Sequence, residues 1–532
     1  DAEAADEAFD DLKGEAEPSP ETSEGLAELL VETTTDASDA QEVESALEIL
    51  SEASAEVDPS ACTIDDECLG FDAPDCPGWW TCDGSCLWHC PSPLDLWSQH
   101  DLHENQQLLP ETVGLGEWVH EDALFQIIEL RLRSFEWATG EKTPISVQGF
   151  VAVPLSGLGV KPAVVLLHGL TSIASAEAAM ALAGQLDAVV LSLNGPGQGG
   201  SLGTGPATEL DVLFRSTPDP RGSWTYAYAL ATARAITYLR GLTVVQQTRI
   251  GVVGSGLAGA VAMLVNGVDS RVRAALILEA AGDIQTGAKQ GSWYSSLLTA
   301  ASLTPYSASL NAWSAFSDPL AYAPYQRGAV LLVVGAQDEY HPISTVATTY
   351  DAIQAPEKRL AVIANWDASY YQSSTGLYNT FNNAQLATAV FRDATRAWFR
   401  HFLHDDPAYG PLLGEPSVTR SDDGVSTTFT AELPGASALP EPPAVRVQYS
   451  GDGAYSFASI ALQLVDDAPG ATPGATSYAV TTNIPPAVWG EHNLVYFVEA
   501  RYATGQEGTE DFLFTSDVHR YETFSPQIRP QQ

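Results

Sequence analysis

The spacing of hydrophobic residues changes along the chain and divides it into regions of different structure. Between residues 163 and 404, short runs that are apolar at nearly every position alternate with longer segments whose apolar residues recur at helical spacing. An uninterrupted apolar run is typical of a strand buried on both faces, as in a parallel sheet covered by helices. The strand-like runs are 163–167, 188–193, 249–253, 274–278, 330–334 and 360–363, and the clearest helical segments are 176–186 and 224–240.

Ahead of this region the pattern alternates, which is typical of strands that have one polar face. Apolar and polar residues alternate over 125–135 and again over 147–153, with the turn-forming segment 138–142 between them. This arrangement predicts an antiparallel hairpin. Because strands and helices then alternate, the sequence predicts an α/β fold with a doubly wound, mostly parallel sheet that the chain enters through the hairpin.

From about residue 415 the helical spacing disappears. Short alternating runs follow one another, separated by Gly, Pro and Asp, at 427–431, 445–449, 460–464, 478–480, 494–498 and 512–514. Several short strands with turn residues between them are typical of an all-β sandwich of the fibronectin or immunoglobulin kind. We therefore expect a β-sandwich domain at 415–532, after an α/β domain at 94–414.

The N-terminal segment has a very different composition. Residues 1–60 contain 20 acidic residues and one Lys, so they supply 19 of the 44 excess negative charges of the chain. A segment with so much charge and so few apolar residues cannot bury enough surface to fold, and we expect an acidic, disordered tether. The chain as a whole has 68 acidic and 24 basic residues, a balance that repels nucleic acid and anionic lipid.

All cysteines of the chain lie in one short stretch, at 61–93. They are Cys62, Cys68, Cys76, Cys82, Cys86 and Cys90. An even number of cysteines in a small segment rich in Gly, Pro and Asp predicts a module held by three disulfides, whose pairing the sequence does not choose. A zinc site is the alternative, but the spacing fits zinc poorly. The same stretch carries Trp79, Trp80 and Trp88, which could bind a carbohydrate or protein or pack on the neighbouring domain.

Disulfides form in oxidising compartments, so we expect a secreted or surface-displayed protein. The sequence starts without an initiator Met or a signal peptide, and no run approaches about 18 consecutive apolar residues. We therefore expect a processed chain without a transmembrane segment. A lipid-bearing Cys just before Asp1 would not be visible in the sequence.

Residues 249–265 predict a strand, a glycine-rich turn and a helix in succession, which is the pattern of a nucleophile elbow. In such an elbow the residues two before and two after the nucleophile must be small, because the backbone there doubles back in a strained turn. Gly254 and Ala258 meet this requirement around position 256. Position 256 should therefore carry the nucleophile, but it carries glycine.

Two alternatives to the assignment of position 256 as the nucleophile position are open. If Ser255 were the nucleophile, Val253 and Leu257 would occupy the two positions that do not tolerate bulk. The glycines of 254–259 also match the G-x-G-x-x-G fingerprint of a dinucleotide-binding turn. That fingerprint should open the first βαβ unit, whereas three strand-like runs precede it here, and Glu279 lies only roughly where its acidic residue belongs.

The order of elements between residues 125 and 404 resembles the α/β-hydrolase superfamily, and within it the secreted acetylxylan-esterase and dienelactone-hydrolase types. The turn His168-Gly169-Leu170 at a strand end looks like the oxyanion turn of that family, whose backbone N–H groups face a developing negative charge. Gly195-Pro196-Gly197 looks like the turn after the next strand. Asp338, in a loop that closes a buried strand, looks like the acid of the catalytic triad.

The resemblance implies a triad of Ser, acid and His in that order along the chain. Besides the glycine at position 256, the expected His is also absent. In relatives it follows a segment like Asn-Trp-Asp, and here residues 365–367 have that sequence but are followed by Ala368. His341 could serve Ser255 as a base, although its place on the loop of Asp338 would require unusual geometry.

Without a hydroxyl or thiol at the elbow there is no covalent route, and without an imidazole a neighbouring Ser has no base. We therefore expect a catalytically inactive hydrolase-fold protein that acts as a scaffold or binding protein, with a protein or carbohydrate partner bound through Trp79, Trp80, Trp88 or the β-sandwich. The alternative is an active secreted hydrolase of acyl or acetyl esters, with Ser255 as nucleophile and a non-standard base. We expect no cofactor, metal ion or nucleic-acid partner.

Overall fold

The computed structural model describes residues 79–82, 85–89, 92–97, 108–157, 159–170, 172–338, 340–366, 386–404, 412–422, 426–439, 441–451, 457–465, 475–482, 494–502 and 512–520. The chain divides into two units, and the second of them holds residues 71–80 and 88–532. The large sheet and the candidate site described below lie in the second unit. The acidic tether expected at 1–60 lies outside the described residues.

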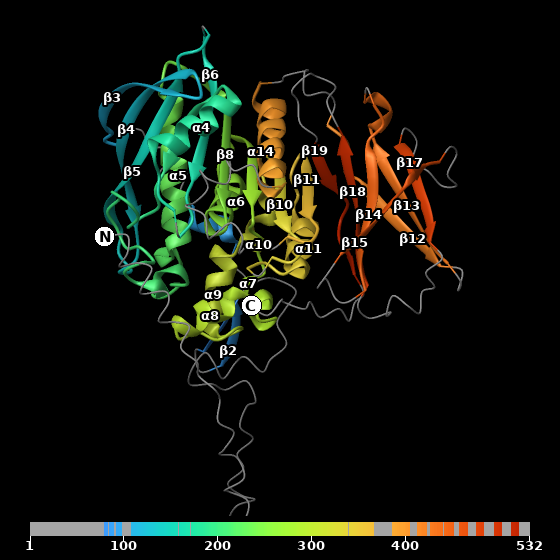
Figure 1. The fold of residues 1–532 in the computed structure, drawn as a ribbon. Coiled ribbons are helices and arrows are strands. Elements are labelled where there is room, and N and C mark those ends of the chain that lie inside the picture. Colours follow the sequence, from blue (N-terminus) through green and yellow to red (C-terminus); the bar gives the residue numbers. More distant parts are fainter. Residues whose placement is uncertain are drawn as a thin grey trace, which may run out of the picture. The chain divides into compact units, whose positions relative to one another are not determined.

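One large sheet runs through the second unit (Figure 1). In spatial order its strands are β15 (Ala458–Ala461), β14 (Ala444–Ser450), β18 (Val495–Tyr502), β19 (Phe512–Thr515), β11 (Lys358–Ile363), β10 (Ala329–Gly335), β9 (Val272–Leu278), β8 (Val245–Ser255), β6 (Lys161–Leu167), β7 (Val189–Leu193), β5 (Thr143–Pro154), β4 (Ala123–Glu136) and β3 (Glu111–His120), and β20 (His519–Arg520) pairs with β18. Strands β7, β6, β8, β9, β10 and β11 are parallel, and β3, β4 and β5 are antiparallel. The predicted α/β fold, with a mostly parallel sheet entered through a hairpin, is confirmed.

Helices cover both faces of the parallel strands. On one face lie α4 (Ala176–Leu186) and α14 (Leu386–Phe399), and on the other lie α5 (Trp224–Arg240), α6 (Leu257–Val268) and α11 (Ile343–Ala352). The shorter helices are α7 (Ile284–Lys289), α8 (Trp293–Ala300), α9 (Ala308–Ser317), α10 (Pro319–Tyr322), the 3₁₀ turns η3 (Pro93–Leu96), η4 (Leu210–Leu213), η5 (Pro220–Gly222), η6 (Ala323–Tyr325) and η9 (Ala436–Ala438), and the π-helical turn η7 (Arg400–His404). None of the helices in the described ranges combines the length and the apolar character that a bilayer crossing requires.

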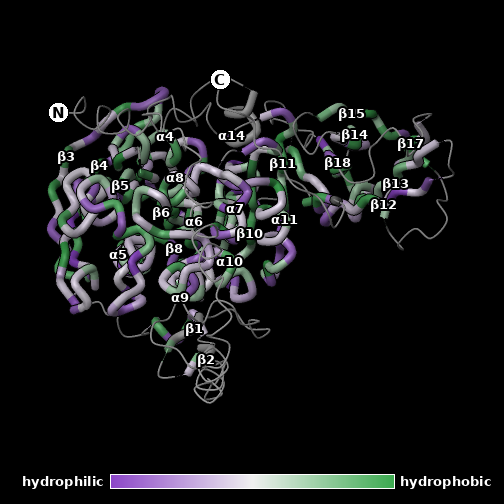
Figure 2. The backbone as a smooth tube through the Cα atoms, turned by 90° about the horizontal axis from the view of Figure 1, so that it is seen from below, coloured by the Kyte–Doolittle hydropathy of each residue, from purple (hydrophilic) through white to green (hydrophobic). Residues whose placement is uncertain are grey.

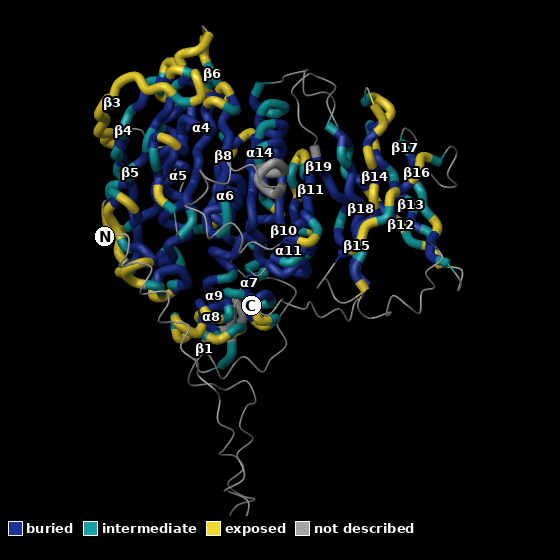
Figure 3. The backbone as a smooth tube through the Cα atoms, viewed as in Figure 1, coloured by how far each residue is buried: buried dark blue, intermediate teal, exposed yellow. Residues whose placement is uncertain are grey.

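The apolar runs of the sequence form the strands because both faces of the sheet are covered. Every residue of β7 and β10 is buried, and in Figure 2 the labelled strands β6, β8 and β10 lie inside the α/β part. The long helices α4 and α5 begin at Ser175 and Ser223, whose hydroxyl groups accept backbone N–H groups of the first turn. Strand β3 differs, because it is exposed along most of its length (Figure 3).

The C-terminal strands belong to two sheets, one of their own and the large sheet of the α/β part. Strands β12 (Ser417–Asp422), β13 (Thr427–Pro434), β17 (Ala475–Thr482) and β16 (Gln463–Leu464) form an antiparallel sheet of their own. The strands β14, β15, β18 and β19 continue the large sheet, since β19 pairs with β11 at Thr515 and Leu360. The domain boundary expected at residue 415 therefore stays a prediction.

The cysteine-rich stretch is described only in part. Strands β1 (Trp79–Cys82) and β2 (Cys86–His89) form a two-stranded sheet. Cys82 and Cys86 are both disulfide-bonded. The other four cysteines and the side chains of Trp79, Trp80 and Trp88 lie outside the described part, so the module with three disulfides stays a prediction.

Candidate functional site

The turn between β8 and α6 is formed by residues that leave no room for side chains. A Cβ atom on Gly254 would collide with the carbonyl group of Ala258. A Cβ atom on Gly259 would lie 2.7 Å from the Cβ atom of Ala280 and 2.9 Å from the carbonyl oxygen of Leu278. Helix α6 can fold back over the end of β8 and pack beside β9 because both positions are glycine.

Gly256 links the last residue of β8 to the first residue of α6. Its φ is 57° and its ψ is −128°, a conformation in which any side chain is strained. Its N–H donates to the carbonyl oxygen of Leu278 at 3.0 Å. No atom lies within 4 Å of the place that a Cβ would occupy. A side chain at this position would therefore extend into open space.

The turn formed by His168, Gly169 and Leu170 follows β6 and lies beside the elbow. A Cβ on Gly169 would be 3.3 Å from the carbonyl oxygen of Ser255, which shows how closely the two backbones approach. The carbonyl oxygen of Gly169 accepts a hydrogen bond from Gln198 Nε2 at 2.9 Å. Gln198 Oε1 in turn accepts the N–H of Gly195 at 3.0 Å, so the two turns singled out in the sequence are held together.

His168 itself has a structural environment. Its Nε2 lies 2.7 Å from Ser192 Oγ, and its backbone N–H donates to the Tyr228 hydroxyl at 2.9 Å. Burial lowers the pKa of the His168 imidazole to about 4, so the ring is uncharged at neutral pH. Within the described residues the N–H groups of Gly169 and Leu170 donate no hydrogen bond, and they are the groups of this turn that remain for an anionic oxygen.

The hydroxyl of Ser255 points to an acidic residue. Ser255 Oγ donates to Glu279 Oε2 at 2.6 Å. Glu279 follows β9 directly, with a φ of 48°, and its N–H donates to Val333. Burial and, to a smaller extent, the negative charge of Asp338 raise the pKa of the Glu279 carboxyl to about 8. At neutral pH Glu279 is therefore mainly protonated.

Asp338 lies in the loop after β10 and is 3 % exposed. Its Oδ1 accepts the backbone N–H groups of Tyr340 at 2.8 Å and of His341 at 3.0 Å. Such bonds favour the charged form of a carboxylate. The structure thus brings Asp338, Glu279 and Ser255 into one cluster next to Gly256.

Sequence reasoning considered Glu279 only as the acid of a dinucleotide site and missed its contact with Ser255. Its position directly after the strand next to the elbow strand was the signal that could have revealed it. The dinucleotide interpretation also requires the first βαβ unit, whereas β8 lies in the middle of the sheet, after β6 and β7 in the chain.

No imidazole reaches Ser255 within the described residues. His341 is 2 % exposed, and its Nε2 lies 3.4 Å from the hydroxyl of Tyr294. Burial lowers the pKa of His341 to about 3, so its ring is uncharged. Ala368, the position that the resemblance assigns to the catalytic His, lies outside the described residues.

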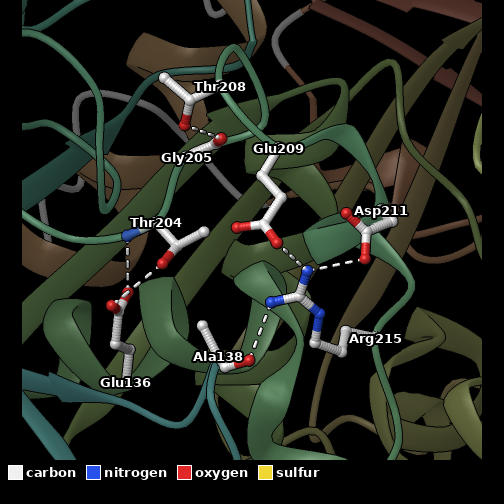
Figure 4. A network of polar contacts seen from close by, with 8 residues as sticks. All are labelled: Glu136, Ala138, Thr204, Gly205, Thr208, Glu209, Asp211 and Arg215. Atoms are coloured by element: carbon white, nitrogen blue, oxygen red, sulfur yellow. Dashed lines mark hydrogen bonds and ion pairs between the residues drawn. The ribbon is translucent and has the colours of Figure 1, made fainter.

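The loop after the Gly195-Pro196-Gly197 turn is fixed by polar contacts (Figure 4). The N–H and hydroxyl of Thr204 donate to the carboxylate of Glu136, the last residue of β4, at 2.8 and 3.2 Å. Arg215 donates to Glu209 at 2.5 Å and to Asp211 at 2.7 Å. These contacts hold the loop in place and so support the turn that Gln198 connects to Gly169.

No protein-family model and no curated relative matches the sequence. Among solved structures, acetyl xylan esterase 1 from Thermoanaerobacterium sp. JW/SL YS485 is 19 % identical over 56 % of this chain and 94 % of its own, with a TM-score of 0.43. The acetyl xylan esterase from Paenibacillus sp. R4 is 16 % identical over 58 % of this chain and 96 % of its own, with a TM-score of 0.44. The Pyrococcus furiosus esterase Pf2001 is 14 % identical over 58 % and 96 %, with a TM-score of 0.34.

Likeness at this level carries no argument about activity. The strand order gives more direct information about the fold. A hairpin leads into parallel strands with helices on both faces, and a turn bracketed by small residues joins the central strand β8 to α6. A parallel central sheet that helices cover on both faces and that the chain enters through a hairpin has the α/β organisation that the sequence predicts.

Proposed function

We propose that the α/β part of this chain is a hydrolase-fold protein without ester-hydrolase chemistry, which acts as a scaffold or binding protein. The observation that carries the proposal is the conformation of Gly256. A φ of 57° between β8 and α6, with open space where a side chain would extend, is what an elbow nucleophile needs. The residue at this position has no side chain to react.

Ser255 is a poor substitute because of the group to which its hydroxyl is bound. A serine nucleophile needs a base that accepts its proton. The group next to Ser255 Oγ is the carboxyl of Glu279, whose pKa is raised to about 8 by burial and by Asp338. A carboxyl that is already protonated at neutral pH cannot accept a second proton from the serine.

The histidines of the region support the same proposal. His168 is bound to Ser192, and His341 lies beside Tyr294. Burial lowers the pKa of both rings, so a positive charge on either of them is disfavoured. A general base must hold a proton during the reaction, and neither ring is positioned or tuned to take one from Ser255.

A second candidate is an active ester hydrolase that uses Ser255. The observation that favours it is the 2.6 Å hydrogen bond between Ser255 and Glu279, because above a pH of about 8 the ionised carboxylate could accept the serine proton. This candidate predicts activity that appears only in alkaline solution. The two candidates therefore differ in a measurable way.

A fluorophosphonate probe separates the two candidates, since it labels only activated serines. We expect no adduct on the full chain by intact mass spectrometry at pH 7 or pH 9, and the same p-nitrophenyl acetate hydrolysis for the wild type and for Ser255→Ala. An adduct that forms on the wild type and not on Ser255→Ala would establish the second candidate.

The assignment of the lost positions is tested by restoring them. Gly256→Ser supplies the hydroxyl at the elbow, and Ala368→His supplies the base at the position that the resemblance implies. Because triad members act as a unit, each single change should have little effect. The double variant should hydrolyse p-nitrophenyl acetate about 10²–10⁴-fold faster than the wild type, the usual contribution of acid–base help. A folded double variant with wild-type rates would show that these positions are wrongly assigned.

In this proposal the chain is secreted or displayed on a surface, as the predicted module with three disulfides would favour. The partner, a protein or a carbohydrate, would bind through Trp79, Trp80 and Trp88 or through the C-terminal strands.

A further inference from the structure

A second candidate site lies at the opposite end of the parallel strands from the elbow. The elbow and the loop of Asp338 follow the carboxyl ends of β8 and β10, whereas a pocket of about 520 Å³ is formed where strands begin. Its walls come from the first half of β8 and from the turns that lead into β9, β10 and β11. This volume lies within the range of pockets that hold small molecules.

The pocket is basic, in contrast to the rest of the molecule. Four arginines line it, namely Arg240, Arg271, Arg273 and Arg327. The chain has only 24 basic residues among 532 and a formal charge of −44. Four guanidinium groups around one cavity therefore mark a local reversal of the overall charge.

Two of these arginines already have partners. Arg271 forms an ion pair with Asp269 at 2.5 Å and donates to the carbonyl oxygen of Ala233 at 2.9 Å. Arg273 Nε lies 3.4 Å from the carbonyl oxygen of Phe402. Both arginines therefore have acceptors within the protein, Arg271 on Asp269 and α5 and Arg273 on the turn η7.

The other two arginines are not explained in this way. The Nε atom of Arg240, at the end of α5, is buried and has no hydrogen-bond partner within the described residues. Arg327 is exposed, and its guanidinium makes no hydrogen bond or ion pair with the part of the chain that the structure describes. A buried donor without a partner costs free energy, which a bound acceptor would recover.

The acidic residue that lines the pocket does not cancel this charge. Glu357 faces the pocket, but its carboxylate is paired with Arg359 at 3.1 Å. The remaining polar lining residues are neutral, namely Gln247, Thr248 and Ser270. The cavity therefore offers guanidinium donors and hydroxyl or amide groups, and its one carboxylate is already neutralised.

We infer that this pocket binds a small molecule that carries an oxyanion group with several acceptor oxygens, a phosphate or sulfate ester. The planar guanidinium group donates two parallel hydrogen bonds to the oxygens of such an anion. Arg240 and Arg327 supply the unused donors, and Arg273 adds positive charge to the wall, whereas the charge of Arg271 is balanced by Asp269. The inference is independent of whether the elbow has activity, because the two sites lie at opposite ends of the strands.

The strong negative charge of the molecule affects how the ligand would approach. Anions are repelled at long range by the charge of −44, and salt screens this repulsion over roughly 10 Å. Direct contacts inside the pocket are screened less. Binding should therefore weaken less with added salt than at an anion site on a basic protein.

The test is isothermal titration calorimetry of the full chain with pyrophosphate, glucose 6-phosphate, glucose 6-sulfate and glucose. The Arg240→Gln/Arg327→Gln variant removes the two unused guanidinium groups. The matched control is Arg446→Gln, an exposed arginine of β14 that lies outside the pocket. Circular dichroism checks folding, and the single variant Arg327→Gln, at an exposed position, replaces the double variant if that one does not fold.

We expect pyrophosphate to bind, with about a tenfold loss of affinity for each guanidinium removed and less than about a twofold change in Arg446→Gln. Binding of only one of the two sugar esters would identify phosphate or sulfate as the natural group. The inference is overturned if pyrophosphate does not bind the wild type, if glucose binds as well as its esters, if removal of the pocket arginines has no effect, or if Arg446→Gln loses as much affinity as they do.

Discussion

The carboxyl group of Glu279 is subject to opposing influences at the elbow. Burial disfavours its ionised form, the charge of Asp338 disfavours it further, and the hydrogen bond from Ser255 favours it. The first two effects are larger, so the pKa is raised to about 8. A neutral carboxyl group beside Asp338 removes the repulsion that two ionised acids would have there.

This raised pKa makes stability depend on pH with a known sign. The folded state holds a proton on Glu279 up to a pH of about 8, whereas the unfolded chain loses it near 4.5, the ordinary pKa of a glutamate side chain. The contribution of protonated Glu279 to the free energy of unfolding is therefore complete below pH 4.5 and is lost as the pH rises towards 8. Glu279→Gln cannot ionise, so it should gain stability relative to the wild type by at most about 1.4 kcal/mol for each pH unit in this window.

The measurement is the difference in urea midpoint between Glu279→Gln and the wild type at pH 5 and pH 8. Glu117→Gln, on the exposed strand β3, is the control for the loss of one charge. A difference that stays constant between the two pH values would contradict protonation of Glu279 in the folded protein.

At the scale of elements, the elbow is a strand and a helix in unusually close contact. Gly254→Ala places a methyl group against the carbonyl of Ala258, where backbone rather than a flexible side chain must move. We expect a loss of about 2 kcal/mol in the free energy of unfolding, as for other overpacked positions, measured by urea denaturation.

Gly114→Ala provides the matched control, because a Cβ there meets no atom within 4 Å. The same chemical change should leave the free energy of unfolding unchanged or raise it slightly, because alanine lowers the conformational entropy of the unfolded chain. If both variants lose the same stability, the cost comes from glycine replacement in general and not from the contact between β8 and α6.

The elements that sequence patterns predicted best are those whose burial is uniform. The apolar runs coincide with β6, β7 and β8 to β11, and the helical segments 176–186 and 224–240 coincide with α4 and α5. Strand β3 was not predicted, because it is exposed on both sides and has no apolar alternation. Its pairing with β4, and not its own composition, makes it a strand.

One part of the candidate site could be predicted from the sequence, and another part could not. The need for small residues at 254 and 258 is a local steric requirement, so the sequence alone could locate the elbow. The bond between Ser255 and Glu279 joins residues 24 positions apart and depends on the register of β8 and β9, in which Ser255 pairs with Leu278. Such a register is set by the packing of the whole sheet, and the sequence pattern does not contain it.

At the scale of the whole molecule, the α/β part and the C-terminal strands share both a sheet and a core. Strand β19 extends the sheet beyond β11, and Arg359 of β11 donates to the carbonyl of Leu413 at 2.7 Å. One hydrophobic cluster contains Ala361 and Trp398 from the α/β part together with Val447 and Phe514 from the C-terminal strands. Separation of the two parts would expose this cluster and the edge of β11.

We therefore expect the α/β part and the C-terminal strands to unfold together. Differential scanning calorimetry of the full chain should show one main transition that includes both parts, because both hydrophobic clusters contain residues of the α/β part and of the C-terminal strands. Two resolved transitions, with the C-terminal strands melting first while the α/β part remains folded, would show that the shared core contributes little.

The shared sheet also determines how the molecule would respond to a pulling force. A force that pulls the C-terminal strands away from the α/β part loads the contact between β11 and β19, in addition to the chain segment that joins the two parts through α14. The backbone register between these strands includes one residue pair, Leu360 and Thr515, supported by the Thr515 hydroxyl, which donates to Leu360 and accepts the N–H of Val362. Because so few hydrogen bonds join β11 to β19, most of the resistance to the force comes from the side chains packed on the two faces of the sheet. We expect the sheet to open first between β11 and β19.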